Sequence, residues 1–210
     1  MPNTDLLISF LLATAVFAYM PGPAMIYATA QTIGGGKRAG WMAALGIHVG
    51  GYVHVFAAAF GLALLFQAVP SIYVSLKLVG AAYLVWLGIG LFRAKVDTSE
   101  ASEVIKPKSA SKAFVASAMV EIFNPKTALF FLAFLPQFTD PTVAFPVWAQ
   151  LLILGTIVNV MFSSADVVCV LMSTKVMALM NRSQSANRLA HRFGGTLLVG
   201  LGINLAVSRQ

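Results

Sequence analysis

Three ionisable residues, Glu121, Lys126 and Asp166, lie within long apolar runs of the 210-residue chain. Charged groups inside the hydrocarbon region of a membrane are costly, and they mark substrate sites or proton paths. Glu121 and Lys126 stand on either side of Asn124 and Pro125, where an apolar helix must break. One acidic and one basic group beside a break suit a zwitterion. The alternative is a structural ion pair between Glu121 and Lys126, with Asp166 facing a cytoplasmic vestibule.

A second break occurs near the N-terminus, at Pro21, Gly22 and Pro23. Proline has no backbone N–H and clashes with the carbonyl four residues earlier, so these prolines free the carbonyls of Phe17 and Tyr19. In hydrocarbon, such carbonyls are tolerated only beside protein groups or a water-filled cavity. We therefore expect the two breaks to face one cavity and to supply the substrate-binding residues, namely Pro21, Gly22, Pro23, Glu121, Asn124, Pro125 and Lys126.

The roles of these residues follow from charge. The positive N-terminal end of a half-helix, with Lys126 beside it, suits a carboxylate, and freed carbonyls with a carboxylate side chain suit an ammonium group. Counted at about 1.5 Å per residue from the cytoplasmic helix ends, Glu121 and Asp166 share a similar depth. Asp166, Glu121 and His54 are the proton-coupling candidates. His54 shares a helical stripe with Gly46 and Gly50, which favours packing and a hydrogen bond across the helix contact over a proton relay.

Other chemistry is not indicated. The chain has no H-E-x-x-H, G-x-S-x-G or G-x-x-x-x-G-K-[ST] motif, so no enzyme and no cofactor are predicted. His48 and His54 are six residues apart and point about 120° apart on a helix, which excludes a metal pair. The run from Gly34 to Arg38 is interpreted as a flexible basic turn rather than a nucleotide loop.

The elements that must position these residues are membrane helices. The chain is 59% apolar and 10% charged, far from soluble proteins at about 25% charged residues. The net charge of +7 could suggest nucleic acid, but the basic residues fall mostly in short connections between apolar runs. At about 20 apolar residues per span we predict six transmembrane helices. Their approximate limits are 5–30, 40–66, 70–92, 113–136, 147–172 and 193–208.

Basic residues alternate between successive connections and so set the orientation. They are present in the first, third and fifth connections and absent from the fourth, which carries Asp140. The positive-inside rule then places the odd connections in the cytoplasm and both termini outside.

Six spans divide into two sets of three that enter the membrane from opposite sides, and each set opens with a proline-broken helix. We therefore predict an all-α membrane protein of two inverted three-helix repeats. A single transmembrane domain covers 1–210, with pseudo-repeats 1–96 and 108–210 joined by a polar cytoplasmic connector, 97–107. The small residues from Gly36 to Gly51 recur at three- and four-residue steps and form a face for close helix packing. We favour packing within the chain; the alternative is a homodimer contact.

The quoted residues resemble the LysE/RhtB amino-acid exporter family. The resemblance rests on Pro21-Gly22-Pro23, on Gly34 to Gly51 with His54 behind it, on residues 78–88, and on residues 124–138, which begin Asn124-Pro125-Lys126. It covers nearly the whole chain, and Asp166 matches an acidic position in the fifth helix. The resemblance implies a permease of the bacterial inner membrane that exports amino acids.

The leading hypothesis is a secondary exporter of a small amino acid, driven by the proton gradient because no ATPase motif is present. Its partners are the amino-acid substrate, protons and membrane lipid. The alternatives are a passive channel or a non-transporting membrane scaffold assembled through glycine-rich helix faces, and, third, an intramembrane enzyme. Basic, hydroxylated and aliphatic amino acids all remain open as substrates.

Overall fold

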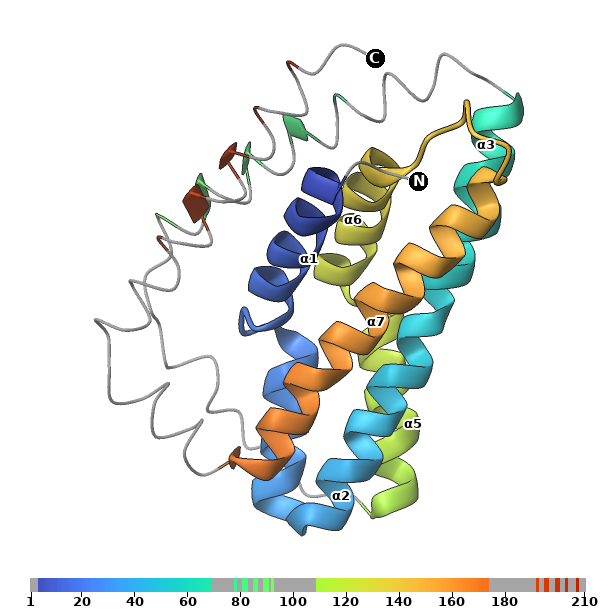
Figure 1. Ribbon diagram of the computed structural model, residues 1–210. Helices are drawn as coiled ribbons and strands as arrows, with labels where there is room; N and C mark the ends of the chain where they lie inside the picture. The colour runs from blue at the N-terminus through green and yellow to red at the C-terminus, as the bar shows by residue number, and fades with distance from the viewer. Residues whose placement is uncertain are drawn as a thin grey trace.

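The computed structural model describes residues 4–68 and 109–173, with isolated positions within 78–92 and 192–207, and every regular element in this part is helical (Figure 1). The predicted third and sixth segments, 70–92 and 193–208, and the connector 97–107 fall largely or wholly outside the described residues. The described elements are α1 (Thr4–Ala18), α2 (Pro23–Phe56), the π-helix η1 (Ala57–Leu62), α3 (Ala63–Ala68), α5 (Ala110–Ile122), α6 (Pro125–Phe134), the 3-10 helix η3 (Leu135–Phe138) and α7 (Val147–Leu171).

The first predicted break lies between α1 and α2. α1 ends at Ala18, and α2 begins at Pro23 with Gly22 in extended conformation as its N-cap. Proline is suited to this first helical position because the N–H that it lacks has no helical partner there. The two helices are therefore the halves of one interrupted segment, as expected for 5–30.

α2 reverses direction at Gly36, so it is a hairpin of two arms (Figure 1). Gly36 has φ 76°, in the left-handed region that glycine adopts at little cost. A Cβ at Gly40 would collide with the side chain of Thr32, which shows how closely the arms approach. Ala28 of the first arm is buried with Ala43 of the second. The run from Gly34 to Arg38 is thus a turn, in agreement with the prediction.

The second predicted break lies between α5 and α6. The axis bends by 45° between Ala110–Ile122 and Pro125–Phe138. Asn124 is the N-cap of α6, and its side-chain oxygen accepts a hydrogen bond from the backbone N–H of Lys126. Asparagine is a favoured N-cap because it satisfies one of the helix's unpaired N–H groups. The break is therefore capped locally.

Several of these helices can span a membrane by length and composition. Within the described residues, Pro23–Leu65, which includes the Gly36 turn, and Val147–Leu171 pass this test, and the bent pair α5–α6 adds a third if it is one span. α1 contributes a shorter apolar helix, Leu7–Ala18. An all-helical membrane protein is thereby supported, while the six-span inverted repeat stays a prediction.

The glycine face of α2 is used inside the chain. A Cβ at Gly46 would meet the Phe114 carbonyl, and one at Gly50 would lie 2.7 Å from the Ala118 carbonyl oxygen on α5. On the other side, a Cβ at Gly51 would meet the side chain of Asn159 on α7. The second arm of α2 can lie between α5 and α7 only because these positions carry no side chain.

A column of phenylalanine rings holds α1 against α6. The ring of Phe17 stacks on Phe130 at 4.1 Å between centroids, and Phe10 lies 5.9 Å from Phe134 and 5.1 Å from Phe138. These rings are at most 5% exposed and form the main buried core. Lys126 precedes Phe130 by four residues, so it shares the face of α6 that meets α1.

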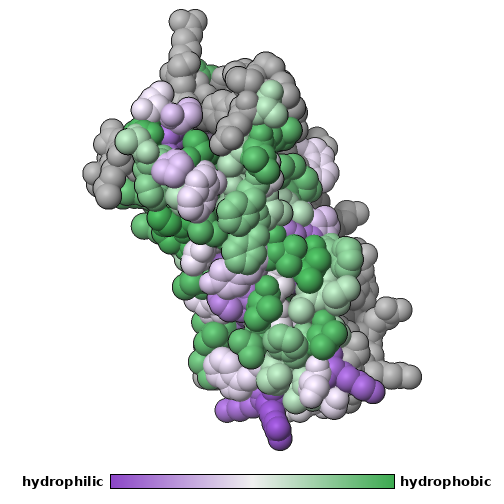
Figure 2. All heavy atoms as spheres, turned by 90° about the vertical axis from the view of Figure 1, so that its right-hand side faces the viewer, coloured by the Kyte–Doolittle hydropathy of each residue, from purple (hydrophilic) through white to green (hydrophobic). Residues whose placement is uncertain are grey.

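Polarity is distributed along the bundle axis. Lys37 and Arg38 follow the Gly36 turn and are exposed, and Figure 2 shows hydrophilic side chains at this lower end below a mostly apolar face. At the opposite end, the loop before α7 is held by Gln150, whose side-chain amide pairs with both the backbone N–H and the carbonyl of Asp140. The basic turn and the Asp140 loop therefore lie at opposite ends, as the positive-inside argument requires.

Candidate substrate site

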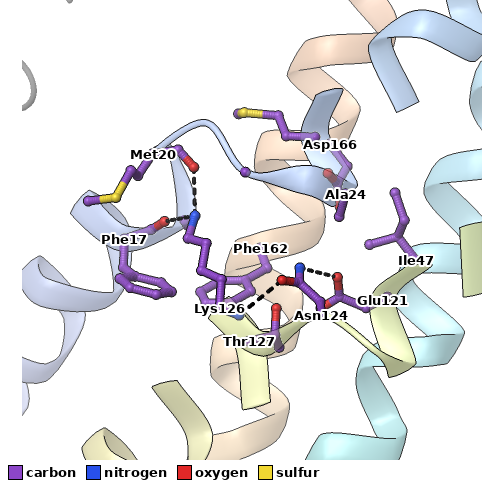
Figure 3. Close-up of a pocket in the computed structure, with 13 residues that line it drawn as sticks. Phe17, Met20, Ala24, Ile47, Glu121, Asn124, Lys126, Thr127, Phe162 and Asp166 are labelled. Atoms are coloured by element: carbon purple, nitrogen blue, oxygen red, sulfur yellow. Dashed lines mark hydrogen bonds between the residues drawn. The ribbon is translucent and has the colours of Figure 1, made fainter. Parts of the chain in front are cut away.

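The two helix breaks meet at one cavity of about 30 Å³ (Figure 3). A water molecule needs roughly 10–15 Å³ of such space, so the cavity has room for about two waters and no amino acid. The site must therefore widen before it can hold an amino acid. The lining residues are Phe17, Ala18, Met20, Gly22, Ala24, Met25, Ile47, Glu121, Asn124, Lys126, Thr127, Phe162 and Asp166.

Lys126 reaches from the second break to the first. Its ammonium group donates hydrogen bonds to the backbone carbonyls of Met20, at 2.7 Å, and of Phe17, at 3.2 Å (Figure 3). The Phe17 carbonyl is one of the two that the sequence predicted Pro21 and Pro23 to free. Lys126 is therefore directed to carbonyl oxygens of α1 and the break, and it is not engaged in the ion pair with Glu121 that was the alternative interpretation.

Two features of the first break admit this side chain. The Lys126 nitrogen lies 4.6 Å from the centroid of the Phe17 ring, where a cation is attracted by the aromatic face. A Cβ at Gly22 would lie 3.0 Å from the Cδ atom and 3.2 Å from the nitrogen of Lys126, which is too close for a side chain without displacement. Gly22 thus leaves the space through which Lys126 passes. We call the Phe17 and Met20 carbonyls together with the Phe17 ring the carbonyl cage.

A hydrogen-bond chain organises the second break. The amide nitrogen of Asn124 donates to Glu121 Oε2 at 3.0 Å, while the amide oxygen of Asn124 caps α6. Glu121 is 3% exposed and Asn124 is 4% exposed. One side chain therefore fixes both the helix start and the buried carboxyl group.

The carbonyl that Pro125 frees is also satisfied by another helix. His54 Nε2 lies 2.8 Å from the backbone oxygen of Glu121. Because a carbonyl oxygen only accepts, Nε2 must carry the proton. The hydrogen bond expected across the glycine stripe is confirmed, while any part of His54 in proton coupling stays a prediction.

Asp166 completes the charged lining from α7. It is 5% exposed, and no described residue donates a hydrogen bond to its carboxyl group, which borders the cavity. Glu121 and Asp166 lie on different helices but border the same cavity, while their depth in the membrane stays a prediction. A buried carboxyl group that borders a cavity is available to a ligand or a proton.

The first break also presents two helix ends of opposite polarity. The carbonyls of Phe17 and Met20 stand at the negative C-terminal end of α1, and Gly22 begins the positive N-terminal end of α2. The α1 end is occupied by Lys126, whereas no side chain caps the α2 end. The two ends together match a zwitterion in charge.

Some predicted site residues shape the cavity without lining it. Pro21, Pro23 and Pro125 form the breaks, and His54 borders a separate apolar hollow of about 340 Å³ next to η1. Two polar residues of α7, Asn159 and Ser163, serve the contact between α2 and α7. Asn159 donates to the His48 carbonyl at 3.1 Å, and Ser163 Oγ lies 2.6 Å from His48 Nδ1.

Eight lining residues were not among the predicted site residues: Phe17, Ala18, Met20, Ala24, Met25, Ile47, Thr127 and Phe162. Met20 directly precedes Pro21, and Phe17 was predicted to supply a freed carbonyl, so both could have been included from the break alone. Thr127 stands one residue after Lys126 in the first turn of α6. Phe162 precedes Asp166 by four residues, the spacing of one helix face. Only the three-dimensional packing shows that these positions face one another.

Comparison with known proteins gives a consistent result over the whole chain. The sequence profile of the LysE type translocators matches residues 15–209. An uncharacterized membrane protein of Pseudomonas aeruginosa is 29% identical, with 95% of this chain and 94% of the relative covered. A leucine efflux protein of Klebsiella pneumoniae is 25% identical over 95% of this chain and 93% of its own length, and one of Enterobacter is 27% identical over 89% and 88%. No solved structure matches the chain.

Proposed function

The chain belongs to the LysE type translocator family, and we propose that it is a secondary exporter of a small zwitterionic amino acid. It is a transporter rather than an enzyme. The observation that supports the substrate class is the cavity where two broken helices meet. That cavity combines freed carbonyls, a lysine and two buried carboxyl groups. Broken helices that converge on a site are the usual construction of secondary transporters.

The first substrate to test is leucine. Two relatives that cover most of the chain are named leucine efflux proteins. Much of the remaining cavity wall is apolar, from Met20, Met25, Ile47 and Phe162. Such a wall suits an aliphatic side chain once the cavity has opened.

The proposed energy source is the proton gradient. Asp166 and Glu121 are buried carboxyl groups at the cavity, where a change of protonation alters the charge that meets the substrate. Asp166 is the first candidate because no described residue holds it by a hydrogen bond. We place the protein in the bacterial inner membrane with both termini outside, following the distribution of basic residues.

Transport by alternating access is supported by the small size of the cavity. A volume of about 30 Å³ holds no amino acid, so the site must change conformation to bind one. A passive channel would instead need a continuous path for the substrate.

The test begins with a growth-inhibition screen against amino acids and their analogues, in cells that overexpress the protein, to identify the substrate. Membrane vesicles loaded with that substrate should then show saturable efflux that depends on the proton gradient. We expect Glu121→Gln or Lys126→Gln to lower efflux by about tenfold or more, the scale of one lost charged hydrogen bond. Lys112→Gln, at an exposed lysine of α5, is the matched control.

Full transport in both cavity variants would remove these two side chains from the mechanism. Flux that does not saturate and persists without a gradient would favour the channel. Absence of resistance to any amino acid and of any efflux would contradict the exporter itself.

A further inference from the structure

We propose that the carbonyl cage is the substrate's ammonium subsite and that the Lys126 ammonium occupies it as an internal substitute whenever substrate is absent. On binding, the zwitterion inserts between the cage and Lys126. Its ammonium group replaces Lys126 at the carbonyls, and its carboxylate receives the released lysine. This inference rests on the proposed amino-acid export and adds to it a mechanism of selection.

The geometry of the cage is that of a primary-ammonium site. A protonated amine has three donors and no acceptor, and the cage offers two carbonyl acceptors and one aromatic face. All three are engaged by Lys126 in the structure, at 2.7 and 3.2 Å to the oxygens and 4.6 Å to the ring centroid. The cage therefore binds a primary ammonium group already, and that group is tethered to the chain.

The occupant is covalently attached but is not locked in place. Lys126 has four rotatable side-chain bonds, and its ammonium meets the cage through two hydrogen bonds. Glu121 and Asp166 border the same cavity, so a lysine that leaves the cage stays near negative charge. Displacement therefore does not strand a cation in an apolar interior.

The opposite end of the break receives the other half of the substrate. The hypothetical Cβ at Gly22 lies 3.2 Å from the Lys126 nitrogen, which places the ammonium directly beside the start of α2. A carboxylate held there would meet the displaced lysine and the uncapped N-terminal end of α2 together. The zwitterion thus supplies an ammonium group to the carbonyl cage, and its carboxylate meets both the displaced Lys126 and the start of α2.

This arrangement selects for zwitterions over their fragments. An amine without a carboxylate can replace Lys126 in the cage, but it brings no anion to the displaced lysine or to the uncapped start of α2. A carboxylate without an amine cannot occupy the carbonyls. Each fragment therefore makes only part of the charged contacts and binds the wild-type protein more weakly than the zwitterion does.

The test is chemical rescue of the empty cage in the purified full-length protein. Lys126→Ala removes the internal ammonium and leaves space, whereas Lys126→Met removes the charge but keeps the space filled. We expect methylammonium chloride to raise the melting temperature of Lys126→Ala by about 2 °C or more. Lys126→Met, the wild type and Lys112→Ala should shift by much less. Tetramethylammonium chloride at the same ionic strength is the control, because it has no N–H donor.

Lys126→Ser is a second variant with an open cage, for use if the alanine variant folds poorly. Equal shifts in all variants, or no shift in a folded Lys126→Ala or Lys126→Ser protein, would overturn the proposal. Failure of both variants to fold even when purified in methylammonium would also count against it. Because the readout is binding, a wild type that exports amino acids while the rescue fails would contradict the cage alone. Successful rescue without any export would contradict the proposed function.

Discussion

At the scale of single residues, the two breaks follow one rule: one carbonyl at each break accepts from a cationic or imidazole side chain of another helix in addition to a nearby backbone N–H. The Phe17 carbonyl accepts from Lys126 and the Glu121 carbonyl accepts from His54. In hydrocarbon, a helix can break only where such partners exist. The side chains that donate to these carbonyls therefore also determine which helices pack together at the breaks.

The rule gives a direct prediction for His54. His54→Ala removes one of two donors to the Glu121 carbonyl, which keeps the Asn124 backbone N–H, and should lower the free energy of unfolding by about 0.5–1.5 kcal/mol. His54→Gln keeps an N–H donor and should lose less, which thermal unfolding in detergent can measure. If His54 only packs, His54→Gln retains export with an unchanged dependence on pH. A stable His54→Gln variant that has lost proton-driven export would instead show that His54 takes part in proton transfer.

A second prediction concerns Asp140, in the loop between η3 and α7, outside the membrane segments. The Thr142 hydroxyl donates to its carboxylate at 2.6 Å and the Thr142 backbone N–H at 2.8 Å, and these bonds lower the pKa of Asp140. A lowered pKa stabilises the folded loop above the ordinary pKa of the group, and this contribution is lost as the pH falls through the lowered value. Thr142→Val should move the pKa back toward its ordinary value, which an NMR titration can follow. An unchanged pKa would show that the hydroxyl does not contribute.

At the scale of helices, the second arm of α2 sets the position of α5 and thereby of Glu121 in the site. Gly46, Gly50 and His54 recur at four-residue steps, and all three meet α5. At Gly50, an added Cβ would lie 3.1 Å from the Cβ of Glu121. The depth and rotation of Glu121 are therefore set by how closely α2 can approach.

Glycine substitutions along this helix test that statement. Gly50→Ala should force α2 and α5 apart at an expected cost of about 1–3 kcal/mol, and it should reduce export because Glu121 moves. Gly61→Ala is the matched control, since nothing lies within 4 Å of the added carbon. Thermal unfolding and vesicle efflux measure the two effects. Equal stability and equal efflux in the two variants would show that the close contact between α2 and α5 is not needed for export.

Prediction from sequence succeeded where local chemistry determines the outcome. Pro21 and Pro125 must interrupt helices, and Gly36 suits a turn that few other residues adopt at low cost. The partner of Lys126 could not be deduced, because the sequence suggested Glu121 or a substrate carboxylate and only the stacking of α1 on α6 brings the carbonyls within reach. The size of the cavity likewise depends on side chains from five helices, α1, α2, α5, α6 and α7.

At the scale of the whole molecule, the described bundle has a basic end and an end without basic residues. Lys37, Arg38 and Lys112 belong to the former, near the Gly36 turn and the start of α5, and the Asp140 loop forms the latter (Figure 1). This polarity agrees with the expected orientation of the odd connections toward the cytoplasm.

Cysteine labelling can determine the orientation. The single native cysteine, Cys169, is buried and should remain unreactive. A membrane-impermeant thiol reagent should label Thr142→Cys in intact spheroplasts, and it should label Lys37→Cys only after the membrane is permeabilised. The reverse pattern would invert the proposed topology. Labelling of both in intact cells would contradict placement of the two turns on opposite sides of the membrane.

The small size of the cavity has a consequence for hydration. Space for about two waters must become space for an amino acid and its surrounding water during each cycle, so opening draws solvent into the protein. Solutes too large to enter would oppose that uptake by osmotic stress, since excluded osmolytes favour the state that exposes less surface. Export should therefore slow as the concentration of an excluded sugar rises at constant viscosity. The slope of that dependence would count the waters admitted at the rate-limiting step.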